Sequence, residues 1–316
     1  MRELRKTVLA GVLLVGGCSY QRTVHPLPII APVRREVDVQ GVKVSYEYSG
    51  DSATSAPVVV LLHGFGASLE SWSDVYPIIA AKHPVLRVDL KGFGLSGKPR
   101  DGKYSARDQA EVVVGVLRAL NVRRPVLVGH SSGGSVAFAT YLRLRAEGDS
   151  RTAALVLVDA GVYEQALPFF ISTLRSEITR YFMYAFTTAD WRTEVVLKRV
   201  YAHDSTMTAE RVRRYSRYLD LPDAHYAFEQ TAMQIVPPDA GELERLLTTI
   251  AVPTLAIWGG DDTIIPLPFA YRLRKDVPGI VVKILNETGH APQEERPLEM
   301  ARLLLDFVSR MVGGER

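Results

Sequence analysis

The stretch that decides the fold runs from Pro125 to Gly134 and reads PVLVGHSSGG. Its first four residues predict a buried strand, and residues 132–145 predict a helix. Between them, Gly129-His130-Ser131-Ser132-Gly133 fits G-x-S-x-G, in which a sharp turn from strand to helix exposes a strained serine. A side chain at either glycine would collide with neighbouring elements. Unpaired N–H groups at the helix start favour negative charge nearby. We therefore predict that Ser131 is a nucleophile.

Strands and helices alternate on both sides of this turn. Residues 37–48 predict a hairpin around Gln40-Gly41. Continuous apolar runs predict strands buried on both faces. The predicted strands are 58–62, 85–88, 126–128, 155–158, 255–258 and 281–285, and the clearest predicted helices are 106–120, 132–145 and 297–312. This order indicates an α/β protein with a doubly wound, mostly parallel sheet. From 161 to 247 helical patterns follow one another without strands, which predicts an inserted helical cap.

A serine nucleophile needs a base, and the base needs an acid that orients it. In a sheet of this kind the acid and then the histidine follow the serine along the chain. His290 follows the predicted strand 281–285, and Asp261 and Asp262 follow the strand 255–258. Asp159, directly after the strand 155–158, is a further candidate for the acid.

Five segments, in this order and spacing, resemble the α/β-hydrolase superfamily, in the branch whose members carry a helical cap. They are His63-Gly64-Phe65-Gly66, residues 89–96, the turn around Ser131, residues 258–266 and Gly289-His290-Ala291-Pro292. The resemblance covers residues 36–312 apart from the cap. It implies a hydrolase core of residues 36–160 and 248–316 and a cap of residues 161–247.

The resemblance also selects the acid. In the family pattern D-x-[IVF]-[IV]-P the acid stands four residues before the proline, here Pro266, which favours Asp262 over Asp261. Asp159 is then expected to anchor the loop that enters the cap. The catalytic residues implied in this way are Ser131, Asp262 and His290.

The remaining parts of the predicted site are backbone groups. An oxyanion hole needs two N–H donors aimed at the developing negative charge. The superfamily geometry implies that Ser132 supplies one and that Phe65 supplies the other. We expect His63 and His130 to have structural roles.

Several features exclude other classes of function. With 316 residues, 47% of them hydrophobic and 23% charged, the chain is not intrinsically disordered. The formal net charge of +3 is too small to indicate the basic surface that binding to nucleic acid requires. Residues 92–97 match the dinucleotide pattern G-x-G-x-x-G, but residues 98–102 predict a loop where a helix is required. Four histidines outside the segments above lack carboxylate or cysteine partners at metal-binding spacing, so we predict no metal site: His25, His83, His203 and His225. We also expect no cofactor. The arginines at 211, 213, 214 and 217 indicate a solvated helix face.

The predicted cap points to an apolar substrate. Residues 161–237 hold 13 of the 27 aromatic residues. Most are expected to pack the cap, and the surplus favours an apolar roof over a ligand pocket.

The N-terminus predicts export and lipid attachment. Residues 1–17 read as a signal peptide, with a basic start and an apolar run too short to span a bilayer. The boundary Gly16-Gly17-Cys18 resembles the lipobox of bacterial lipoprotein precursors, which implies cleavage before Cys18 and its acylation. Residues 18–35 form a proline-bearing tether. We therefore expect a membrane-anchored lipoprotein of the cell envelope, at the outer membrane facing the periplasm in a Gram-negative host, because Ser19 follows Cys18.

These observations favour a serine hydrolase that cleaves a carboxylic ester of an apolar small molecule. Two alternatives stay open. One is a carbon–carbon bond hydrolase of ring-cleavage products that uses the same triad, and the other is a non-catalytic ligand-binding module on the same fold. Serine at position 131 argues against dehalogenase and epoxide hydrolase relatives, which carry aspartate there.

Overall fold

A computed structural model describes residues 33–51, 54–237 and 239–313. The predicted signal peptide, Cys18 and all of the tether before residue 33 lie outside these residues. No helix in the described ranges combines the length and the apolar character needed to cross a bilayer.

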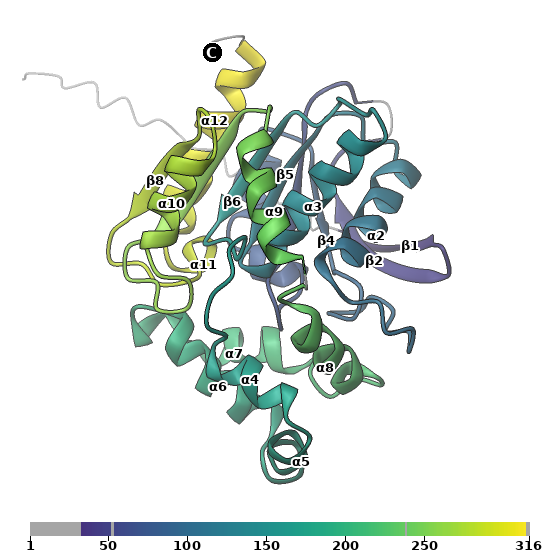
Figure 1. The fold of residues 1–316 in the computed structure, drawn as a ribbon, viewed down its shortest axis with the longest axis vertical. Helices are drawn as coiled ribbons and strands as arrows, with labels where there is room; N and C mark the ends of the chain where they lie inside the picture. Colours follow the sequence, from purple (N-terminus) through teal and green to yellow (C-terminus); the bar gives the residue numbers. More distant parts are fainter. Residues whose placement is uncertain (1–32, 52–53, 238, 314–316) are drawn as a thin grey trace, which may run out of the picture. The chain divides into compact units, whose positions relative to one another are not determined.

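The described chain is built on one eight-stranded sheet (Figure 1). Its order is β1-β2-β4-β3-β5-β6-β7-β8. The first two strands pair antiparallel with each other, and β2 pairs antiparallel with β4, whereas all other neighbours are parallel. The mostly parallel sheet predicted from the apolar runs is confirmed. The strands are β1 Arg34–Val39, β2 Val42–Tyr48, β3 Val58–Leu62, β4 Val85–Val88, β5 Pro125–His130, β6 Ala154–Val158, β7 Thr254–Gly259 and β8 Val281–Leu285.

Helices cover both faces of the sheet, as a doubly wound fold requires. Alternate residues of β3 point to opposite faces, so Val58 and Val60 join one apolar cluster while Val59 and Leu61 join the other. The first cluster includes α2 (Ala106–Ala119), α3 (Ser132–Ala146) and α10 (Pro268–Asp276). The second includes α1 (Tyr76–Ala80) and α12 (Pro297–Gly313). A capping box of Ser105 and Asp108 begins α2, as the sequence predicts.

Between β6 and β7 the described residues form helices and no strand. In Figure 1 α4 to α8 gather beyond one end of the sheet and form a separate layer, for which we keep the name cap. The helices of this stretch are α4 Phe169–Arg175, α5 Glu177–Phe186, α6 Ala189–Val200, α7 Ala209–Ser216, α8 Ala224–Gln234 and α9 Ala240–Leu246.

Two details differ from the sequence expectations. Strand β1 begins at Arg34, so the last two residues of the predicted tether belong to the sheet. Arg34 is held there by ion pairs to Glu47, Glu70 and Asp89, which an alternation of apolar residues does not reveal. The expected solvated face of arginines is also wrong for Arg211 and Arg214, which are largely buried and bridge the cap to Asp74 of the core. Arg217 is exposed as expected, although it too pairs with a core residue, Glu70.

Candidate active site

Ser131 stands in the turn between β5 and α3 with a strained backbone. Its φ is 54° and its ψ is −124°, a backbone conformation that residues other than glycine rarely adopt. Its N–H donates to the carbonyl oxygen of Val158 at 2.9 Å. A Cβ at Gly129 would lie 2.1 Å from the carbonyl oxygen of Gly133, and a Cβ at Gly133 would lie 2.4 Å from that of His63. Both positions therefore require glycine, because the two loops approach backbone to backbone.

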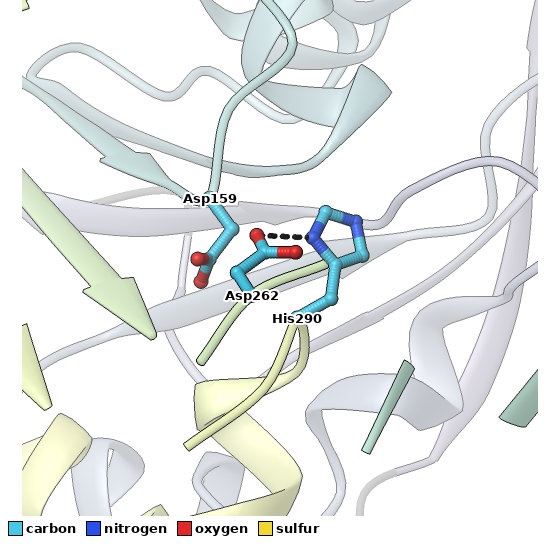
Figure 2. Close-up of side chains that lie close together, drawn as sticks. All are labelled: Asp159, Asp262 and His290. Atoms are coloured by element: carbon cyan, nitrogen blue, oxygen red, sulfur yellow. Dashed lines mark hydrogen bonds and ion pairs between the residues drawn. The ribbon is translucent and has the colours of Figure 1, made fainter. Parts of the chain in front are cut away.

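Three of the predicted residues form one hydrogen-bonded chain. The Ser131 hydroxyl lies 2.9 Å from Nε2 of His290, and Nδ1 of His290 lies 2.7 Å from Oδ2 of Asp262. Figure 2 shows the carboxylate of Asp262 directed at the imidazole. The other oxygen of Asp262 accepts the N–H groups of Ile264 and Ile265 at 2.7 and 2.9 Å. Since an ionised carboxylate only accepts, Nδ1 carries the proton and Nε2 is left as the acceptor for the serine hydroxyl.

Asp159 lies beside Asp262 in Figure 2 but does not contact the imidazole. It is fully buried, and Oδ1 accepts the N–H of Gly259 at 2.9 Å. Burial and the neighbouring Asp262 raise the pKa of Asp159 well above its ordinary value. Burial also raises the pKa of Asp262, but the His290 imidazole outweighs it and holds that pKa below the ordinary value. Asp159 is therefore the protonated member of the pair and Asp262 the ionised one.

This cluster is also the one grouping of potential metal ligands among the described residues. Candidate ligand atoms of Asp159, Asp262 and His290 lie within 4.8 Å of one another. Asp262 and His290 are hydrogen-bonded to each other, and Asp262 and Asp159 each accept backbone N–H groups. Only Oδ2 of Asp159 has no hydrogen-bond partner among the described residues. The arrangement fits an acid that orients a base better than it fits a metal centre.

The loop that carries His290 is fixed by the residue before the nucleophile and by the cap. The N–H of His290 donates to the carbonyl oxygen of Val200 in α6 at 2.7 Å. Burial lowers the pKa of His130 to about 3, so its ring is neutral, and Nε2 donates to the carbonyl oxygen of His290 at 2.6 Å. The two rings lie 4.9 Å apart. His130 thus positions the base, a role that its variable place in G-x-S-x-G does not signal.

Two consecutive glutamates of α11 (Pro292–Glu295) connect the same loop to the cap. Oε2 of Glu294 accepts the hydroxyl groups of Tyr201 and Tyr215 at 2.6 and 3.0 Å. Glu295 accepts the N–H of Ala202 at 2.8 Å and that of Gly289 at 2.9 Å. The contacts with Tyr201, Ala202 and Tyr215 join residues 79 to 93 positions apart in the chain, so the sequence offers no local signal for them.

Residues 57–297 match the family described as alpha/beta hydrolase fold. The chain belongs to the alpha/beta hydrolase fold family. It is 30% identical over 284 residues to the uncharacterized hydrolase YugF of Bacillus subtilis, covering 88% of this chain and 98% of that protein.

Two further relatives of this alpha/beta hydrolase differ in what their names state. A 2-hydroxy-6-oxononadienedioate/2-hydroxy-6-oxononatrienedioate hydrolase of Cupriavidus pinatubonensis is 27% identical over 267 residues, covering 83% of this chain and 90% of that protein. The crystal structure of a membrane phospholipase A, described as a bacterial virulence factor, superposes with a TM-score of 0.71 at 25% identity, covering 89% and 86% of the two chains. The chain is a hydrolase of this fold, and its relatives act on more than one kind of bond.

The hydrolase holds a cavity of about 190 Å³ beside Ser131. Phe65 and Ser132, the predicted oxyanion donors, both line it, as does His290. Its wall is mostly apolar, and five of the thirteen aromatic residues of the 161–237 segment contribute to it: Tyr163, Phe170, Tyr184, Tyr215 and Phe228. The expected apolar roof is therefore present. The expectation that the other aromatic side chains pack inside the cap is wrong for five that are at least half exposed: Phe169, Tyr181, Phe182, Phe186 and Trp191.

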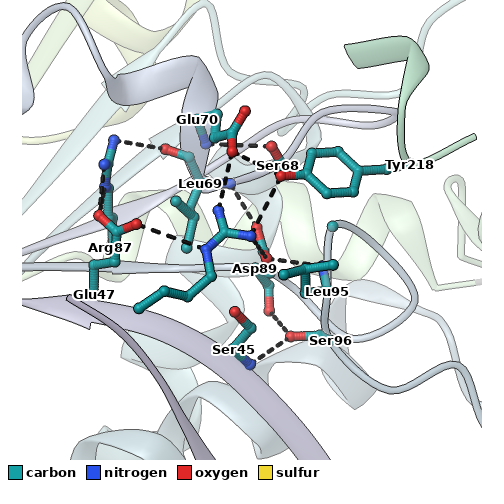
Figure 3. Close-up of polar contacts among 12 residues, drawn as sticks. Ser45, Glu47, Ser68, Leu69, Glu70, Arg87, Asp89, Leu95, Ser96 and Tyr218 are labelled. Atoms are coloured by element: carbon teal, nitrogen blue, oxygen red, sulfur yellow. Dashed lines mark hydrogen bonds and ion pairs between the residues drawn. The ribbon is translucent and has the colours of Figure 1, made fainter. Parts of the chain in front are cut away.

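The glycine-rich segment 92–97 lies in a loop that Asp89 organises (Figure 3). Asp89 accepts the N–H groups of Leu69 and Leu95 at 2.7 and 2.9 Å. A Cβ at Gly94 would lie 2.2 Å from the Asp89 carboxyl carbon. After it the chain continues through turns and bends, not a helix, up to residue 102. The loop therefore lacks the helix N-terminus that a dinucleotide phosphate requires.

The structure thus brings Ser131, Asp262 and His290 together and places Phe65 and Ser132 at the same cavity. Asp261 is exposed, and its N–H donates to the carbonyl oxygen of Thr288 at 2.9 Å, so it is a turn residue. His63 is buried between two loops, with Nδ1 2.8 Å from the carbonyl oxygen of Gly64. Cys18, the predicted lipid attachment site, is not among the described residues.

Proposed function

We propose that the protein is a serine hydrolase that cleaves carboxylic esters of apolar small molecules. The observation that carries the proposal is the continuous chain from the Ser131 hydroxyl through His290 to Asp262, at the wall of an apolar cavity. Nucleophile, base and orienting acid within hydrogen-bond reach are the requirement for acyl transfer.

In the proposed reaction Oγ of Ser131 attacks the ester carbonyl carbon while Nε2 of His290 takes its proton. Asp262 keeps Nδ1 protonated and stabilises the imidazolium that forms. The N–H groups of Phe65 and Ser132 receive the negative charge on the carbonyl oxygen. His290 then gives its proton to the leaving alkoxide, which departs as an alcohol. Water, deprotonated by the same nitrogen, attacks the acyl-enzyme and releases the carboxylic acid and Ser131.

The cavity bears on the choice of substrate. Its volume of about 190 Å³ is of the same order as the roughly 150 Å³ apolar cavity that holds a benzene ring. An acyl or aryl group of moderate size fits inside it, and a longer chain has to extend through its opening.

A carbon–carbon bond hydrolase is the second candidate, favoured by the relative from Cupriavidus pinatubonensis. The substrate in that relative's name is a dioate, which carries two carboxylates. Among the lysines and arginines of the described residues, Arg192 alone lines the cavity. Its guanidinium already donates to Asp220 at 2.5 Å and to the carbonyl oxygen of Thr187 at 2.8 Å. This engagement supports an uncharged ester as the better fit.

The decisive experiment measures the rate at which the protein and its Ser131→Ala variant hydrolyse p-nitrophenyl esters, from acetate to palmitate, and a ring-cleavage dienoate. Ester turnover that the variant lacks supports the proposal. Turnover of the dienoate alone would replace it with carbon–carbon hydrolysis. Failure of a fluorophosphonate probe to label Ser131, with no turnover, would favour a non-catalytic ligand-binding module.

We also propose that the protein is exported and held at a membrane through a lipid on Cys18. The support is the basic residues near the start, the uncharged run of residues 7–17 and the boundary Gly16-Gly17-Cys18. Diacylglycerol together with a further acyl chain is sufficient for stable anchoring, whereas one chain is not.

A further inference from the structure

The cap carries a row of apolar side chains that faces away from the protein. Helix α5 buries none of its residues. Four of them, which we call the outer stripe, are Ile178, Tyr181, Phe182 and Phe186, with exposures of 72%, 68%, 55% and 76%. Tyr181 and Phe182 follow Ile178 by three and four positions, and Phe186 follows Phe182 by four. The four side chains therefore share one helix face. In Figure 1 α5 forms the tip of the cap, on the side that faces away from the sheet.

The side chains of the outer stripe form one contiguous surface. The ring centroids of Tyr181 and Phe182 lie 5.5 Å apart, and those of Phe182 and Phe186 lie 5.9 Å apart with nearly parallel planes. Contiguous apolar groups on a protein surface mark a site of interaction, whereas single ones do not.

The opposite face of α5 belongs to the enzyme's interior. Met183 and Tyr184 line the cavity beside Ser131. Arg180 fixes the helix to α8 through an ion pair of 3.0 Å with Glu229. The outer stripe is therefore presented on a helix that is held in place and forms part of the pocket wall.

The charges around the stripe narrow the choice of partner. Residues 181–189 include no charged side chain, and the exposed charges nearest in sequence are Arg175, Glu177 and Asp190. An anionic membrane or a nucleic acid would require a cluster of basic residues. A neutral apolar partner does not require one.

The area of the stripe argues against a second copy of the chain. One aromatic side chain can bury about 150–250 Å². Scaled by the observed exposed fractions, the four side chains together offer an apolar surface on the order of 500 Å². One side of a stable protein interface buries about 800 Å². Tyrosine is instead typical of the interface of a bilayer, and phenylalanine is typical of the apolar face of helices that lie in that interface.

We propose that the outer stripe inserts into the surface of a zwitterionic lipid bilayer. The four side chains enter the headgroup region and the neighbouring acyl chains, and the pocket wall formed by α4 and α5 then faces the membrane. The proposal does not depend on the reaction. It also does not require the lipid on Cys18.

The protein contains its own reporter for this contact. Of its three tryptophans, Trp72 and Trp258 are fully buried, whereas Trp191 is 52% exposed and follows Phe186 by five residues. Tryptophan fluorescence of the full chain carrying Cys18→Ser is measured with phosphatidylcholine vesicles whose acyl chains are brominated, and with unbrominated vesicles. Brominated lipid quenches only a tryptophan that reaches the bilayer, so we expect selective loss of the Trp191 emission.

The test variant is Phe182→Ser with Phe186→Ser, and the matched control is Tyr271→Ser with Leu298→Ser. The control residues are 54% and 75% exposed and belong to α10 and α12, outside the cap helices α4 to α8. We expect vesicle binding about tenfold weaker for the stripe variant, equivalent to about 1.4 kcal/mol, and unchanged for the control. Circular dichroism and hydrolysis of a water-soluble ester should be unchanged in both, because none of these side chains lines the cavity.

Three results would overturn the proposal. They are no quenching of Trp191 at any lipid concentration, undiminished quenching in the stripe variant, and a dimer seen by light scattering that only the stripe variant abolishes. The last result would identify a second copy of the chain as the partner. Loss of ester hydrolysis throughout, with quenching retained, would refute the proposed function and leave the membrane contact standing.

Discussion

Glu294 provides a sharp test of how the cap is tied to the loop of the base. The side chain is 2% exposed and accepts hydrogen bonds from Tyr201 and Tyr215. Burial raises the pKa of Glu294 from an ordinary value near 4.5 to about 7. The two tyrosine hydroxyl groups and Arg211 act in the opposite direction and lower this pKa, whereas Asp74 raises it slightly further. The folded protein therefore keeps this proton to a higher pH than the unfolded chain does.

The sign of the pH dependence follows from that difference. The stabilisation is fully present below about pH 4.5 and is lost as the pH rises through about 7. Each pH unit in this window corresponds to about 1.4 kcal/mol for one proton. Between pH 5 and pH 8.5 the protein should thus lose about 2.5 kcal/mol of its free energy of unfolding from this one group.

Glu294→Gln removes the titration while keeping the size of the side chain. Its amide oxygen can accept both tyrosine hydroxyl groups, but its nitrogen replaces Oε1, which has no hydrogen-bond partner among the described residues. That change has a pH-independent cost of about 1–3 kcal/mol. The quantity to measure is therefore the difference in unfolding free energy between protein and variant, by urea titration at pH 5 and at pH 8.5. We expect this difference to shift by about 2.5 kcal/mol in favour of the variant.

The exposed Glu299 supplies the matched control, since Glu299→Gln removes the same charge from the surface of α12. A shift for Glu294→Gln no larger than that of the control would contradict the reasoning. So would a shift in favour of the parent protein.

Three other outcomes are expected. Ser131→Ala and Ser131→Gly should both abolish ester hydrolysis. The free energy of unfolding should be about 1 kcal/mol higher for the glycine variant than for the alanine variant, because glycine relieves the strained φ of 54°. Equal melting temperatures would count against stored strain. Asp262→Asn should lower kcat by about 10⁴ through the wrong imidazole tautomer, whereas Asp159→Asn should have a much smaller effect, because the group it replaces is already neutral. A crippled Asp159→Asn with an active Asp262→Asn would reverse the two roles. Cys18→Ser should abolish lipid attachment, read from the mass of the N-terminal peptide and from detergent partitioning, and leave kcat unchanged; an unmodified Cys18 in the parent protein would refute the anchor.

Much of the fold could be predicted because its signals are local. A strand buried on both faces reads as an apolar run, and β3 and β5 to β7 each have one. The turn at Ser131 was predictable because its residue pattern lies within one short segment, although only the contact of Gly129 with Gly133 is local and that of Gly133 is with His63. The resemblance to the family pattern that ends at Pro266 indicated Asp262, whose carboxylate accepts the N–H groups of residues two and three positions later.

The sequence by itself determined the order of strands and helices, the serine turn and the candidate base and acid. Only the tertiary structure decided that Asp159 is neutral, that His130 and Glu294 hold the loop of His290, and that the α5 aromatic side chains face outward. The physical reason is the same in each case. A protonation state or an exposed fraction depends on burial and on neighbouring charges, and these come from segments that lie far apart in the chain.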